Sequence, residues 1–181
     1  MRALSDEREQ VRLSVVAGRL ALQIWPLLLL AAIACLAAVT WWTIHGDMVF
    51  LGPAGRLLVL VYGGLLGSYV VHECAHVLAL RRMPGVTRIE VERSVWRFSI
   101  IPSGTMSARQ VVVVAAAGPL SAVAVGLLLV LVGLDRVLGA VYLVHGIQLL
   151  PVFGDGRALI SGLRGNRLDT ESRETAGRPP R

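Results

Sequence analysis

Four long apolar segments constrain the fold of this chain more than any other feature of its sequence. They cover about residues 20–42, 57–80, 111–134 and 137–153, and as helices they can each cross the roughly 30 Å hydrocarbon core of a bilayer. A helix also satisfies its own backbone hydrogen bonds, which lipid cannot do. Because 55% of the 181 residues are hydrophobic, we predict an all-α membrane protein with four transmembrane helices, all within residues 20–163.

The arginines predict how these helices are oriented. All 18 basic residues are arginine. They gather in residues 1–19, in the 81–110 connection and after residue 156, whereas 44–56 and 135–136 hold one each. Cytoplasmic loops carry the excess of positive charge, so we expect both termini and the 81–110 connection to be cytoplasmic, in a multi-pass protein of a bacterial cell membrane. The net charge of +6 is then explained by the arginines that orient the helices in the membrane. We expect no nucleic-acid partner, because no recognised nucleic-acid motif accompanies this charge.

The segments outside residues 20–163 are polar. Residues 1–19 are expected to form a cytoplasmic N-terminal segment. Residues 164–181 are rich in arginine, glycine and proline near their end, and we predict a disordered tail there.

The 81–110 connection carries patterns typical of strands. Residues 88–92 alternate polar and apolar side chains, and residues 95–101 are rich in residues that favour β-structure. Pro102-Ser103-Gly104 is predicted to end the second strand. We expect a small cytoplasmic β-hairpin over about residues 86–101, with an ordinary amphipathic loop as the alternative.

The second apolar segment contains His72-Glu73-Cys74-Ala75-His76. Two histidines at i and i+4 project from one face of a helix, and with glutamate at the second position they form the H-E-x-x-H zinc-hydrolase pattern. Ionisable groups inside a membrane cost roughly 2.5–3.5 kcal/mol each on insertion scales, so they usually mark a function. We therefore predict one Zn²⁺ per chain, bound by His72 and His76, with Glu73 as the general base. The alternative is a pair of buried histidines that hydrogen-bond across a helix bundle.

A catalytic zinc site needs a third protein ligand and an open position for water, and Asp155 is the best candidate. Under the predicted topology the second and fourth helices both run toward the cytoplasm, so their C-terminal ends meet the same face. His76 lies five residues before Arg81, or roughly 7–8 Å along the helix axis, and Asp155 ends the fourth helix at a comparable depth. The glycines on either side of Asp155 let the backbone aim its carboxylate inward. Asp155 could instead only cap a short helix over 156–163.

Two further polar residues lie in the fourth segment. His145 is three helical turns before Asp155, so we expect it to lie away from the metal and to serve packing or an interhelical hydrogen bond rather than ligation. Gln148 is one to two turns from Asp155 and can hydrogen-bond either a substrate backbone or a neighbouring helix. Cys74, two positions after His72, is on the far side of its helix and is expected to pack.

Three motifs resemble the site-2 protease family of intramembrane zinc metalloproteases, over about residues 57–160. His72-Glu73-Cys74-Ala75-His76 matches the first family motif, Ala117-Gly118-Pro119-Leu120-Ser121 the glycine-proline start within the next helix, and Leu149-Leu150-Pro151 through Asp155-Gly156 the motif that ends in Asp-Gly. The resemblance implies a three-helix catalytic core, zinc bound by His72, His76 and Asp155, and Glu73 as the base. It also implies cleavage of transmembrane segments of membrane-anchored proteins, often regulators, with a β-hairpin that helps present the substrate as an extended strand.

The chain departs from the family pattern at four points. Many members have Asn where Gln148 stands, a residue thought to hold the substrate, and Ala122 occupies a position often held by Asn. The spacing from Pro151 to Asp155 is one residue shorter than the common form, and Gly154 stands where Leu is frequent. These departures concern substrate handling more than metal binding.

Three functions therefore remain open at the level of sequence. The first is an intramembrane zinc endopeptidase acting on a membrane-anchored protein substrate within the lipid bilayer. The second is a protease-like membrane protein that binds metal and regulates or binds a partner without cutting it. The third, a plain structural membrane protein, requires the whole zinc constellation to be accidental.

Overall fold

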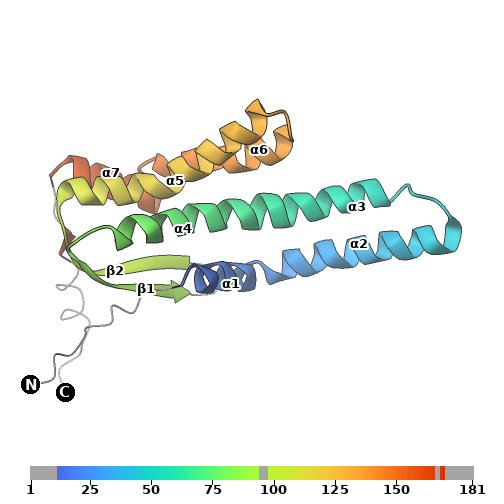
Figure 1. Cartoon of the computed structure of the whole chain (residues 1–181), viewed down its shortest axis with the longest axis horizontal. Helices are drawn as coiled ribbons and strands as arrows, with labels where there is room; N and C mark the ends of the chain where they lie inside the picture. Colours follow the sequence, from blue (N-terminus) through green and yellow to red (C-terminus); the bar gives the residue numbers. More distant parts are fainter. Residues whose placement is uncertain (1–11, 94–97, 166–167, 170–181) are drawn as a thin grey trace, which may run out of the picture.

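The computed structural model describes residues 12–93, 98–165 and 168–169. It is mostly helical, with a π-helical segment η1, a 3₁₀ segment η2 and a small antiparallel sheet (Figure 1). Its elements are α1 (Leu13–Gln23), α2 (Trp25–His45), α3 (Leu51–Leu58), η1 (Val59–Leu66), α4 (Gly67–Arg81), β1 (Val86–Arg93), β2 (Phe98–Met106), α5 (Ala108–Leu131), α6 (Arg136–Leu143), η2 (Val144–Leu149), α7 (Gly154–Leu163) and β3 (Leu168–Asp169). The expectations for residues 1–11, 166–167 and 170–181 fall outside the described residues. Within the tail predicted to be disordered, Leu168 and Asp169 instead form β3, which pairs with the end of β2.

Among the described residues, three helices are long and apolar enough to cross a membrane. They are α2, the continuous helix Leu51–Arg81 formed by α3, η1 and α4, and α5. A fourth span exists if Arg136–Leu149 and α7, which are bent by 45° at a short break, are taken together. The structure therefore shows a mostly helical chain with helices of spanning length and a small sheet, as expected at this level.

The first apolar segment begins later than the sequence pattern predicts, because the helix breaks at Ile24. This residue has φ −109° and ψ 17°, and α2 starts directly after it with Pro26 in its first turn. Proline is favoured there, since its missing N–H has no intrahelical partner at that position. The preceding helix α1 packs separately, with Val16 and Leu20 buried against Val77 of α4. Part of the stretch expected to be a cytoplasmic tail is thus helical and packed on the bundle.

The fourth apolar segment is broken instead of forming one helix over 137–153. After α6 the chain tightens into η2, and Leu150 then adopts an extended conformation with φ −71° and ψ 148°. The residue before a proline is pushed out of the α region by the proline ring, and Pro151 follows Leu150 directly. The chain then turns and restarts as α7.

The predicted β-hairpin is present. Strands β1 and β2 pair antiparallel, with Glu90 opposite Ile101 and Arg93 opposite Phe98; residues 94–97, where part of the second strand was expected, lie outside the described residues. The prediction that Pro102-Ser103-Gly104 ends the second strand is wrong, because β2 continues to Met106. Among the described residues β3 pairs with β2 only at its last two positions, so Pro102 lies on an edge strand, where proline is tolerated.

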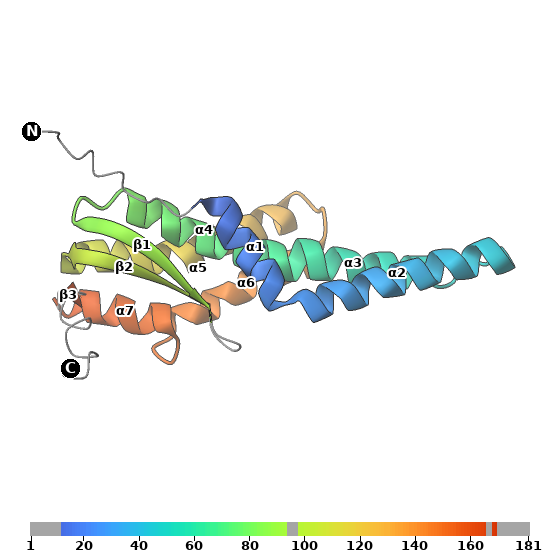
Figure 2. The same ribbon diagram turned by 90° about the horizontal axis from the view of Figure 1, so that it is seen from below.

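One cluster of buried side chains joins the hairpin to the helices at one end of the molecule. It contains Leu80 of α4, Val86 and Ile89 of β1, Met106 of β2 and Val111 of α5. Figure 1 shows the β-hairpin at this end, with α1 between it and α2, and Figure 2 shows α7 and β3 at the same end as the β-hairpin. The α2–α3 helix pair reaches beyond the other helices at the opposite end. The end that carries the β-hairpin, called the hairpin end below, is therefore where α4, α5, α7 and the sheet meet.

Candidate metal centre

His72 and His76 lie one turn apart on α4 and project from the same face, as the i and i+4 spacing predicts. Both are buried in the bundle. The third member of the group, Asp155, lies in the first turn of α7. In the part of the chain that the structure describes, these three form the one group of His, Cys, Asp or Glu residues arranged to hold a metal ion.

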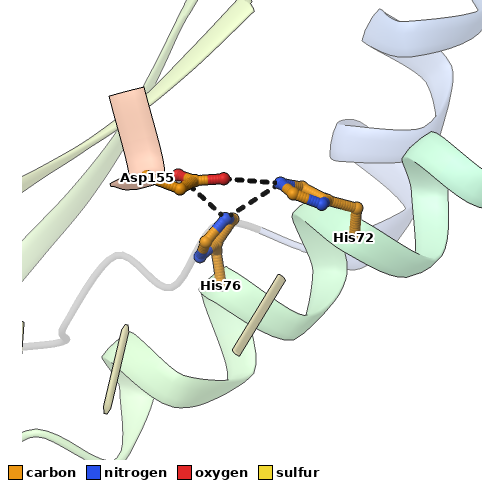
Figure 3. A group of neighbouring side chains, drawn as sticks. All are labelled: His72, His76 and Asp155. Carbon is orange, nitrogen blue, oxygen red and sulfur yellow. Dashed lines mark hydrogen bonds and ion pairs between the residues drawn. The ribbon is translucent and has the colours of Figure 1, made fainter. Parts of the chain in front are cut away.

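The donor atoms of these residues form a small triangle (Figure 3). His72 Nε2 lies 3.1 Å from His76 Nε2 and 3.1 Å from Asp155 Oδ2, and His76 Nε2 lies 3.4 Å from Asp155 Oδ1. Ligands that bind zinc at about 2.0–2.1 Å in a tetrahedron are separated from one another by roughly 3.3 Å. The separations are close to that value, but Asp155 presents a different oxygen to each histidine. With one ligand atom from each residue, the three atoms lie within 4.8 Å of one another, so the residues can supply three ligands to one ion.

The hydrogen bond on the far side of His76 determines what its ring presents to the other two residues. Its Nδ1 lies 2.8 Å from the carbonyl oxygen of Val114 on α5, and a carbonyl can only accept, so Nδ1 carries the proton. In the neutral ring Nε2 then holds a lone pair, which faces the Asp155 carboxylate and His72 Nε2. Lone pairs brought together at these distances repel unless a proton or a metal ion lies between them. Metal-binding histidines commonly donate their second N–H in this way, which fixes the ring and its tautomer.

The approach of α5 to the site depends on Gly118. A Cβ atom at this position would lie 2.3 Å from His76 Nε2, far inside van der Waals contact. The glycine thus leaves the space that the His76 imidazole occupies. Pro119 follows it, buried inside α5.

Asp155 is aimed at the histidines by the turn between η2 and α7. A Cβ atom on Gly156 would lie 2.0 Å from the carbonyl oxygen of Leu150, so the close turn requires glycine there. The alternative role of Asp155 as a helix cap is not what the structure shows, because the cap of α7 is Phe153 and it makes no side-chain capping bond. The Asp155 side chain remains 25% exposed, against 3% for His72, so the site opens on the Asp155 side.

Glu73 is adjacent to the triangle without belonging to it. It is partly buried on α4 and close enough to His76 and Asp155 to interact electrostatically with both. A carboxylate beside a metal-binding triangle but outside the ligand set is available to exchange protons. Cys74, which was expected to pack, borders the cluster of Val16, Leu20 and Val77 under α1.

The expectation that His145 lies away from the site is wrong. Its ring is 5.1 Å from that of His72, centroid to centroid, and 4.8 Å from that of Tyr69. A straight α-helix would separate His145 from Asp155 by about 15 Å along its axis. The 3₁₀ turn and the break at Leu150 instead fold the two residues toward the same place.

Gln148 contacts His145 and not the ligand triangle. Its Nε2 lies 3.3 Å from His145 Nδ1. Residues three apart eclipse one another on a 3₁₀ helix, and this places the amide above the imidazole. Its predicted contact with a substrate backbone stays a prediction.

Sequence reasoning found the three candidate ligands but missed two groups that shape the site. The Val114 carbonyl has no sequence signal, because every residue carries one. The position of His145 could have been suspected from Gly146 and Pro151, which mark irregular backbone within the apolar segment.

Comparison with known proteins gives no relative for this chain: no family model, no curated protein and no solved structure matches it.

Proposed function

We propose that this protein is an intramembrane zinc metalloprotease of the site-2 protease type. The observation that carries the proposal is the close group of His72, His76 and Asp155. The two Nε2 atoms lie 3.1 Å apart, Asp155 Oδ2 lies 3.1 Å from that of His72, and Oδ1 lies 3.4 Å from that of His76. Glu73 lies on the same helix as the two histidines and is not a member of this group of three candidate ligands. Three protein ligands with an open position are typical of catalytic zinc, whereas structural zinc is closed by four.

Each residue of the site has a separate role in the proposed peptide hydrolysis. His72, His76 and Asp155 would hold Zn²⁺, which supplies a Lewis acid and activates water for attack on the scissile carbonyl. Glu73 accepts a proton during that attack and delivers it to the leaving amine nitrogen. Val114 and Gly118 on α5 keep the His76 ring in place, the first by a hydrogen bond and the second by leaving room.

We further propose a four-span architecture with a three-helix catalytic core. The core consists of the helix Leu51–Arg81, α5, and the bent pair of α6–η2 with α7. The β-hairpin and β3 lie at one end of the molecule (Figure 2), and on the arginine distribution we place that end in the cytoplasm. The substrates are membrane-anchored proteins, whose transmembrane segments would reach the site from the bilayer.

The proposal is tested by separating metal binding from cleavage. Glu73→Gln is nearly isosteric but cannot take up a proton, so it should keep about one zinc per chain and lose roughly 10²–10⁴-fold in cleavage rate. Asp155→Ala should instead lower the zinc content, because two histidines alone make a poor zinc site. Zinc is measured by elemental analysis of the purified protein, and cleavage on a candidate membrane substrate in the same preparations.

The outcome also decides between the protease and a non-cleaving regulator that binds metal. A regulator tolerates Glu73→Gln in every assay of its function. If Glu73→Gln holds its metal and cleaves at the parent rate, the assignment of Glu73 fails and the protease mechanism with it.

The orientation is tested by cysteine labelling in intact cells. In a background with Cys35 and Cys74 replaced by alanine, Glu90→Cys in the exposed part of β1 should resist an impermeant reagent added outside. Met48→Cys, which is 62% exposed in the α2–α3 turn, should react. The reverse labelling pattern would contradict the proposed orientation and would leave the proposed metal ligands unaffected.

A further inference from the structure

His145 is a buried polar side chain that the ligand set and the proton transfer leave unused. It is 4% exposed, and its ring lies between Tyr69, in an edge-to-face contact, and His72, at a tilt of 39°. It is outside the group of residues whose donor atoms can reach a common ion. A phenylalanine would fill the same space without the cost of placing a polar ring among apolar helices. The polar atoms of His145 therefore need an explanation.

The contact with Gln148 determines which nitrogen of His145 carries its proton. With the amide oriented as in the structure, Gln148 Nε2 donates to His145 Nδ1 across 3.3 Å. A neutral imidazole that accepts at Nδ1 carries its proton on Nε2. In the described part of the chain this Nε2–H has no hydrogen-bond partner, and it belongs to a ring packed against a metal-binding histidine.

We propose that the Nε2–H of His145 donates a hydrogen bond to the oxygen of the scissile carbonyl as negative charge develops on it. This inference rests on the proposed function and adds a catalytic residue to it. During hydrolysis a bond forms between the carbonyl carbon and the water oxygen, and the C–N bond breaks. One water proton passes through Glu73 to the amine nitrogen, and no electrons are gained or lost. His145 keeps its proton throughout and serves only as a donor.

The setting makes such a donor effective. A hydrogen bond aimed at developing charge contributes more in a site of low dielectric constant than it does in water. Gln148 and the 3₁₀ turn hold the imidazole in one tautomer before the substrate arrives, so little reorganisation is needed during the reaction. Gln148 acts through His145 and is a positioning residue.

The test uses two replacements of His145 in the zinc-loaded full chain. His145→Phe keeps an aromatic ring against Tyr69 and His72 but removes the donor, and His145→Gln keeps an N–H donor. We expect His145→Phe to retain the zinc content of the parent and to lower kcat by about 10²–10³-fold with little change in KM. His145→Gln should recover part of that loss.

A binding measurement gives a readout independent of turnover. A phosphonamidate dipeptide with leucyl side chains carries tetrahedral anionic oxygens like those of the transition state. Its affinity for the zinc-loaded protein should fall in His145→Phe by a factor similar to the loss in kcat. Gln148→Ala should weaken the same affinity less, because the imidazole remains but is no longer held in one tautomer.

Each outcome decides between the inference and its alternatives. If the parent cleaves and binds the phosphonamidate and His145→Phe does both equally well, His145 only packs and the inference is overturned while the protease proposal stands. If His145→Phe loses its zinc, the residue supports the metal and the proposed donor role is wrong. If the parent neither cleaves nor binds, the proposed function and this inference fall together.

Discussion

At the hairpin end, α4, α5 and α7 pack so closely that only glycine fits at some contacts between them. Gly118 of α5 faces His76 of α4, and Gly162 of α7 faces the backbone of α5. At the α2–α3 end the helices expose most of their apolar side chains, among them Trp41, Ile44 and Phe50. Hydrocarbon chains can cover these side chains as well as protein can, so lipid contact requires no close packing between helices there. A cluster of polar side chains needs fixed partners, and those exist only where several helices are packed together.

Two histidines illustrate the contrast. His45, at the C-terminal end of α2, is exposed and stacks on Trp41 at 4.1 Å between ring centroids. His76 is buried, bonded to a backbone carbonyl and directed at a carboxylate. The same type of residue is thus a candidate for the membrane interface at the α2–α3 end and a candidate metal ligand at the hairpin end.

The largest expected effect follows from removing histidines at the packed end. The double variant His72→Ala, His76→Ala should lose essentially all of its zinc, because one carboxylate is left. The matched control His45→Ala should keep about one zinc per chain. Elemental analysis of both purified proteins measures the difference, and normal zinc content in the double variant would remove the metal assignment.

The next largest expected effect is on stability and zinc affinity, and it concerns the glycines on either side of Asp155. Gly156→Ala drives a Cβ atom into the Leu150 carbonyl, so the turn must open; we expect the free energy of unfolding to fall by about 1–3 kcal/mol and zinc affinity to fall with it. At Gly154 an added Cβ meets nothing within 4 Å. Gly154→Ala is therefore the control, and equal thermal stability and zinc affinity for the two variants would contradict the role of the close turn.

Gly118→Ala tests how tightly α5 confines His76. The added Cβ would displace the imidazole, and we expect a 10–100-fold loss of zinc affinity, as found when a residue that orients a metal ligand is changed. Gly55 in α3 is also helical, and an added Cβ there meets nothing within 4 Å. Competition with a zinc chelator measures both affinities; a Gly118→Ala protein that matches Gly55→Ala would show that α5 can move away at little cost.

The smallest effect concerns an exposed ion pair far from the metal. Arg56 of α3 hydrogen-bonds the carboxylate of Asp135, whose Oδ1 lies 3.0 Å from Arg56 Nη2. That contact and the bond from the Leu138 N–H lower the pKa of Asp135 to about 2. A depressed carboxyl pKa stabilises the folded state above the unfolded pKa, near 3.9, and the stabilisation is lost as the pH falls from about 4 toward 2.

Because exposed ion pairs contribute little, Arg56→Ala should shift the thermal midpoint only slightly at pH 7. The difference between this variant and the parent should disappear toward pH 2, and zinc content at pH 7 should not change. A stability difference that stays constant down to pH 2 would show that Arg56 acts through packing and not through Asp135.

The sequence by itself determined that the chain has helices of spanning length, and it identified the three members of the candidate metal group. Apolar segments of spanning length are set by local composition, and helical periodicity alone places His72 and His76 on one face. The alternation in residues 88–92 was enough for a β-strand. These properties depend on neighbours along the chain, so the chain order contains them.

Only the tertiary structure decided how the candidate metal group is held and which other residues lie beside it. Leu150 is extended, so the fourth segment bends and His145 lies against His72. A straight helix would instead have held His145 about 15 Å from Asp155. The Val114 carbonyl fixes the His76 tautomer, and Gly118 and Gly156 matter because of what faces them. Except for the turn at Gly156, these contacts join residues far apart in sequence, and they depend on angles between helices that no local pattern specifies.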